Sequence, residues 1–157
     1  MLVVYIFILQ TMVDKNSFIA QLEKLLLHLK NSKLEYLKAS DKINSPELKR
    51  HFNLMATERN KFFQEILSLI QSFNISNDDL IIGRFNYDQL LISSIHEINS
   101  SPIKKCVKSD EILLEIYFKI EKIKGESKIF SDQKSKIEKS LMKNLDFANI
   151  LSGVKKS

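Results

Sequence analysis

Apolar side chains recur every three or four residues along most of this 157-residue chain, which is the spacing of one face of an α-helix. The pattern predicts a first helix over residues 17–39 and a second over residues 45–73. The first helix has its apolar face at Leu22, Leu25, Leu26, Leu29 and Tyr36. The second has its stripe at Leu48, Phe52, Met55, Arg59, Phe62, Phe63, Ile66 and Ile70. Helices of this length are typical of a bundle.

Serine followed by proline marks the start of two helices. At Ser45-Pro46-Glu47 and at Ser101-Pro102, the serine can cap free backbone N–H groups and the proline fits the first turn. The third long helix therefore begins near residue 101, and Gly125 favours its end. Its stripe is Ile103, Cys106, Val107, Asp110, Leu113, Leu114, Tyr117 and Ile120. A last helix is expected from Ser131, with its apolar face at Ile137, Leu141, Leu145, Ala148 and Leu151.

A long connection over residues 74–101 separates the second and third helices. Residues 76–79 (Ser-Asn-Asp-Asp) indicate a turn or cap, Gly83 permits a reversal, and residues 87–98 predict a shorter helix. A connection of this kind lets the helices on either side run parallel, as in crossover bundles of the ferritin type. The predicted fold is all-α: a ferritin-like four-helix bundle with a long crossover that contains a short additional helix.

Residues 1–13 carry no charged side chain and are mostly apolar. This run is shorter than the ~20 residues of a transmembrane helix, and it lacks the basic region and cleavage site of a secretory signal. We therefore divide the chain into an apolar extension, 1–13, and a single bundle domain, 14–154. One interpretation places the native start at Met12. The alternatives are an apolar arm that packs on the bundle or on a partner, and a lipid contact.

The amino-acid composition argues against several classes of site and partner. A single cysteine excludes an internal disulfide framework and a cysteine zinc site, and three histidines leave little room for a histidine-rich metal centre. The net charge is +5, but both signs are interspersed and no basic stripe is visible, so we expect no nucleic-acid partner. Neither a glycine-rich phosphate loop nor a G-x-S-x-G nucleophile elbow occurs. We expect Cys106 in the core, His51 near the surface, and the serines at caps and solvent positions.

Three segments taken together resemble a known family. They are Leu22-x-x-Leu25-Leu26 continuing to Tyr36-x-x-Ala39, then Leu48, Phe52 and Glu58-Arg59 with the apolar run to Leu67, and last Cys106, Asp110 and Tyr117. In this pattern, over residues 17–151, the chain is similar to the uncharacterised bacterial family of small four-helix bundles in the ferritin-like superfamily. The resemblance implies a bacterial, cytoplasmic bundle with a role related to stress.

The resemblance raises the question of a di-iron centre. Such a centre needs a glutamate from each of two helices and a Glu-x-x-His motif from each of the other two. The positions three before the three histidines hold no acid: they are Leu25, Leu48 and Ser93. Glu58 is followed three positions later by Lys61, and Leu145 stands where a ligand histidine would be expected on the last helix. We therefore expect no di-iron site and no cofactor.

Two charged residues fall on apolar stripes, Arg59 on the second helix and Asp110 on the third. A buried charge must be paired, or its burial costs several kcal/mol. We hypothesise that Arg59 pairs with Asp110 or another inward carboxylate, and that Tyr36 and Tyr117 complete the hydrogen bonds. In the alternative, Arg59 extends its charged end to the surface and packs only its stem.

These observations favour a non-enzymatic protein that acts through a protein partner or as a homodimer, with no catalytic residue that the sequence can name. The alternative is an atypical metal-binding or redox bundle that uses carboxylates alone, because oxygen ligands suit hard cations. Its candidate ligands are Glu35, Glu58, Asp110 and Glu111. Membrane-surface attachment through residues 1–13 is a third hypothesis, and we do not expect it.

Overall fold

The computed structural model describes residues 1–73, 92, 101–125 and 127–151. Within these residues it forms four helices: α1 (Leu2–Lys42), α2 (Pro46–Gln71), α5 (Pro102–Lys124) and α6 (Lys128–Leu151). The predicted all-α fold is confirmed for this part of the chain. The short helix predicted over residues 87–98, with nearly all of the connection around it, lies outside the described residues.

Capping groups fix three of the helix ends. Ser45 Oγ accepts a hydrogen bond from the backbone N–H of Leu48, and Ser101 Oγ accepts one from Lys104, each at 3.3 Å. Gly125 has a φ of 80°, in the left-handed region that favours glycine, and its N–H donates to the carbonyl of Glu121 at 2.8 Å. The sequence therefore predicted the start of α2 and both ends of α5 from local chemistry.

Two predicted starts were wrong. α1 begins at Leu2 rather than near residue 17, because no glycine or proline interrupts the helix between the apolar extension and the bundle. α6 begins at Lys128 rather than near Ser131, directly after the turn at Gly125. The apolar extension is thus a continuous part of the first bundle helix.

Two apolar clusters share the interior of the bundle. Cluster A contains Phe18, Leu22, Leu25, Leu26, Leu29, Phe62, Ile66, Ile70, Ile112, Leu113, Ile116, Tyr117, Ile120, Phe130 and Ile137. Cluster B contains Tyr36, Ala39, Leu48, Phe52, Ala56, Ile103, Cys106 and Val107. Full burial of one such aliphatic or aromatic side chain contributes about 1.5–3 kcal/mol, so the clusters are the main source of stability.

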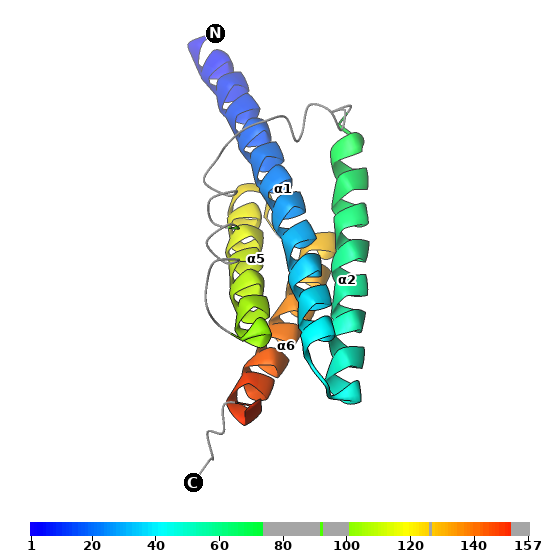
Figure 1. Ribbon diagram of the computed structural model, residues 1–157. Coiled ribbons are helices and arrows are strands. Elements are labelled where there is room, and N and C mark those ends of the chain that lie inside the picture. The colour runs from blue at the N-terminus through cyan, green and yellow to red at the C-terminus, as the bar shows by residue number, and fades with distance from the viewer. Residues whose placement is uncertain (74–91, 93–100, 126, 152–157) are drawn as a thin grey trace.

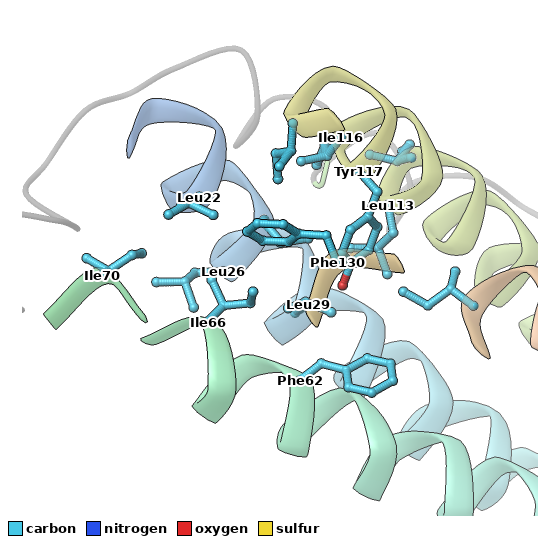
Figure 2. Close-up of a cluster of buried hydrophobic side chains, with 14 of the residues drawn as sticks. Leu22, Leu26, Leu29, Phe62, Ile66, Ile70, Leu113, Ile116, Tyr117 and Phe130 are labelled. Atoms are coloured by element: carbon cyan, nitrogen blue, oxygen red, sulfur yellow. The ribbon is translucent and has the colours of Figure 1, made fainter. Parts of the chain in front are cut away.

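The order of the clusters along each helix gives the helix directions. α1 passes from cluster A to cluster B, whereas α2 and α5 pass from cluster B to cluster A. α6 begins in cluster A and ends beside cluster B. Hence α2 and α5 run parallel to each other and antiparallel to α1 and α6, as Figure 1 shows. Figure 2 shows Leu26, Ile66, Ile116 and Phe130, one from each helix, among the side chains gathered in cluster A.

The first part of α1 extends past the bundle (Figure 1). The described side chains before Phe18 are exposed. Among the described residues, α1 is the helix that is long and apolar enough to cross a membrane.

The buried face of α6 is more polar than predicted. Leu145 and Leu151, which were expected on its apolar face, are 44% and 56% exposed. Gln133, Ser140 and Asn144 are buried instead. These polar residues share a three-to-four spacing with Ile137, and they can be buried because they find hydrogen-bond partners inside the bundle.

Candidate functional site

A layer of hydrogen-bonded polar side chains lies between the two apolar clusters. We call it the polar layer, and its members are Ser32, Tyr36, His51, Glu58, Arg59, Asp110, Ser140 and Asn144. Arg59 is fully buried on α2, between Ala56 of cluster B and Phe62 of cluster A. It is among the largest fully buried side chains of the molecule.

The guanidinium of Arg59 is bonded to every helix. Nη2 donates to Asp110 Oδ1 on α5 at 3.1 Å and to Ser140 Oγ on α6 at 2.6 Å. Nη1 donates to Glu58 Oε1 on α2 at 2.7 Å, and Nε donates to Ser32 Oγ on α1 at 3.2 Å. Arg59 therefore pairs with the carboxylate of Asp110 and does not extend to the surface.

A chain of hydrogen bonds leads from this ion pair toward α6 and α2. The phenol of Tyr36 donates to Asp110 Oδ2 at 2.5 Å, and Asn144 Nδ2 donates to the Tyr36 oxygen at 2.6 Å. Asn144 Oδ1 then faces His51 Nε2 at 3.0 Å. Since an amide oxygen only accepts, Nε2 of His51 carries the proton and donates it in this bond.

Charge and burial shift the pKa values of Arg59 and Tyr36 in the layer and of the neighbouring Cys106. Burial acts to lower the pKa of Arg59, but the charge of Asp110, with Tyr36 and Glu58, outweighs it and raises that pKa. Burial and the Asp110 carboxylate raise the pKa of Tyr36 well above its usual value, and the same two causes raise the pKa of Cys106. The guanidinium stays charged, whereas the phenol and the thiol stay neutral.

Tyr117 does not join the Arg59 cluster, contrary to the prediction. Its hydroxyl donates to Gln133 Oε1 at 2.6 Å, and Gln133 Nε2 donates to Glu65 Oε2 at 3.0 Å. Tyr117 lies seven residues beyond Asp110, or about 10 Å along the helix, which places it within cluster A. Burial is the main cause that raises the pKa of its hydroxyl.

The four candidate carboxylate ligands do not converge. Glu111 is exposed, because it adjoins the fully buried Asp110 and points about 100° away from it. Glu58 bonds to Arg59, and buried Glu35 lies 3.9 Å from Lys38 Nζ. Among the described residues, no three His, Cys, Asp or Glu side chains form a group that could hold a metal ion.

The sequence pointed to Arg59 and Asp110, but not to the serine partners of Arg59 or to the burial of His51. His51, expected near the surface, is only 7% exposed, because Phe147 packs against its ring and Asn144 bonds to it. Ser32 and Ser140, expected at caps or in solvent, are buried. The one feature of the sequence that could have indicated this burial is spacing. The small polar residues lie three or four positions from apolar residues that are buried.

No protein-family model, curated protein or solved structure matches this chain. The chemistry of the polar layer therefore follows from its own geometry. That geometry ties four helices together through one cation.

Replacing Arg59 should be strongly destabilising. Arg59→Leu leaves the Asp110 carboxylate buried without its cation, and we expect a loss of about 3–5 kcal/mol in the free energy of unfolding, measured with urea. Adding Asp110→Asn should restore part of the loss by removing the unpaired charge. Arg50→Leu, at an exposed arginine of the same helix, should change stability by less than about 0.5 kcal/mol. An unchanged or higher stability of Arg59→Leu would contradict a structural role for the charge.

Stability should also fall in weak acid because of His51. Burial is the main cause that lowers the pKa of His51 below its usual value of 6.5. The unfolded chain then binds more protons than the folded chain as the pH falls through 6.5, so the free energy of unfolding decreases. His51→Gln keeps a donor for Asn144 Oδ1 and should reduce the decrease measured between about pH 7.5 and pH 5.5. The same decrease in both proteins would rule out His51 as its source.

Proposed function

We propose that this protein is a non-enzymatic helical bundle that acts by binding proteins, and that a second copy of the chain is one such partner. The observation that carries the proposal is the position of Arg59. Its guanidinium occupies the middle of the bundle and binds the Asp110 carboxylate, where a metal-binding bundle would present inward acids to cations. Because the guanidinium of Arg59 takes the place that a metal ion would have, we assign the polar layer a structural role.

The protonation states of Arg59, Tyr36 and Cys106 support this proposal. General acid–base catalysis is most efficient when a group titrates near the working pH, and a nucleophile must be activated by a base or a lowered pKa. Tyr36 and Cys106 have raised pKa values, and Arg59 stays charged. These groups are suited to hold a fixed hydrogen-bond pattern rather than to exchange protons with a substrate.

The helix directions support a relation to ferritin-like bundles. α2 and α5 run parallel and are joined by a long connection, which is the crossover arrangement of that group. We include in the proposal that the chain is a bacterial, cytoplasmic bundle of this type without its di-iron site. The stress-related role rests on the sequence resemblance alone.

Exposed apolar side chains near the end of α6 supply a surface for a partner. Met142 is 69% exposed, Leu145 44% and Ile150 71%. In Figure 1 this end of α6 extends below the other helices. Neighbouring exposed apolar groups are typical of interaction sites, and this surface is the one we assign to self-association.

We expect the full chain to self-associate in sedimentation-equilibrium experiments. Met142→Lys combined with Leu145→Lys should weaken the association at least about tenfold, because two apolar contacts are replaced by charges. Leu54→Lys, at an exposed leucine of α2, is the control and should leave the association unchanged. A chain that remains monomeric at about 100 µM would contradict the self-association part of the proposal.

Metal content tests the non-metal part of the proposal. We expect no stoichiometric iron, manganese or zinc in untagged protein purified without chelator, and none after reloading, because Arg59 already forms ion pairs with both Asp110 and Glu58. Stoichiometric metal would favour the carboxylate-only alternative. In that case Asp110→Asn should lose the metal, whereas Glu111→Gln, at the exposed neighbouring acid, should retain it.

A further inference from the structure

The first part of α1 carries a run of exposed apolar side chains. We call residues 1–13 the arm. From Leu2 to Leu9 every side chain is apolar or aromatic, with an exposed fraction between 44% at Leu9 and 79% at Val3. Figure 1 shows the arm projecting past the other helices. Apolar surface of this extent in water calls for an environment that covers it.

The apolar surface of the arm covers the whole circumference of the helix. Residues 2–9 make more than two turns at about 3.6 residues per turn, and no side of these turns is polar. A helix that docks into a groove or pairs with a second helix is amphipathic, with one apolar face. A second copy would cover only one side of the arm, whereas hydrocarbon covers every side.

α1 enters the bundle at Phe18, five residues after the arm, and we call this point the base of the arm. Its ring packs edge-on against the rings of Phe73 and Phe130, each with centroids 6.0 Å apart. Lys124 Nζ lies 5.3 Å from the centre of the same ring. The ends of α2 and α5 and the start of α6 therefore surround the base of the arm.

Exposed lysines occur where α1 enters the bundle, where α5 ends and where α6 begins: Lys15, Lys122, Lys124 and Lys128. The acids nearest to them in the sequence are Asp14, Glu121, Glu126 and Asp132, and Glu121 is already paired with Lys134 at 3.0 Å. Four lysines beside an apolar helix complement a bilayer that contains anionic headgroups.

Charged residues follow the arm directly in the sequence, at Asp14 and Lys15. Charged side chains are costly in hydrocarbon, so they mark where the helix leaves a bilayer. Contrary to the expectation from the sequence, we propose that the arm inserts into an anionic bilayer, that the four lysines bind the headgroups, and that the bundle is thereby held at the membrane surface.

Vesicle binding by the full chain tests this proposal. The sequence has no tryptophan, so Tyr5→Trp places a single reporter in the arm. We expect the Trp emission to shift to shorter wavelength, and the protein to float with vesicles of phosphatidylcholine and phosphatidylglycerol. Binding should weaken as salt is raised, because salt screens the lysines. It should be weaker still with vesicles of phosphatidylcholine alone.

Two matched substitutions locate the lipid-binding surface. Ile6 is 57% exposed in the arm and Leu54 is 59% exposed on α2. Ile6→Asp should lower vesicle binding at least about tenfold, whereas Leu54→Asp should leave it unchanged. Lys122→Glu with Lys124→Glu should lower binding to the anionic vesicles only. Circular dichroism should show the same helix content in all variants.

Three outcomes would overturn the proposal. The first is an absence of flotation with either vesicle. The second is an equal loss in Ile6→Asp and Leu54→Asp, and the third is equal binding to neutral and anionic vesicles, which would remove the role of the lysines. If Ile6→Asp instead abolished self-association in lipid-free solution and no vesicle bound, the arm would pair with a second copy. The association test on α6 does not involve the arm, so the two proposals can fail separately.

Discussion

A charge buried among four helices must be neutralised where it stands, and Arg59 meets this requirement with one hydrogen-bond partner from each helix. This requirement sets the register of the bundle. If one helix slid by a turn, the carboxylate of Asp110 or the hydroxyls of Ser32 and Ser140 would move by about 5 Å and the guanidinium would lose a partner. The apolar clusters on either side tolerate such a shift far better, because apolar contacts are not directional.

The same ion pair connects the fold to the proposed function. Asp110 binds the guanidinium through one oxygen and the phenol of Tyr36 through the other, so its capacity to bind a further cation is largely used. Replacing a buried ion pair by apolar residues is often neutral or stabilising in proteins, so the pair is best understood as a device for specificity. For this reason the proposed function places the partners of the bundle on its surface.

α1 serves two environments along one helix. Its second half supplies Leu22 and Leu25 to cluster A and Tyr36 to the polar layer, whereas the described side chains before Phe18 are exposed. The change occurs at Phe18, where rings from α2 and α6 close the bundle. Because α1 is one continuous helix, the direction of the arm sets the direction in which the bundle extends from the surroundings of the arm.

The sequence by itself determined the all-α fold, the caps at Ser45 and Ser101, the end of α5 at Gly125, and the presence of Arg59 and Asp110 on inward stripes. These features depend on residues close together in the chain, so their spacing is sufficient to predict them. Only the tertiary structure decided that Ser140 and Asn144 are buried, that His51 is shielded, and that Tyr117 bonds elsewhere. Ser140 and Asn144 are buried beside partners from distant helices, and helical spacing carries no information about such partners.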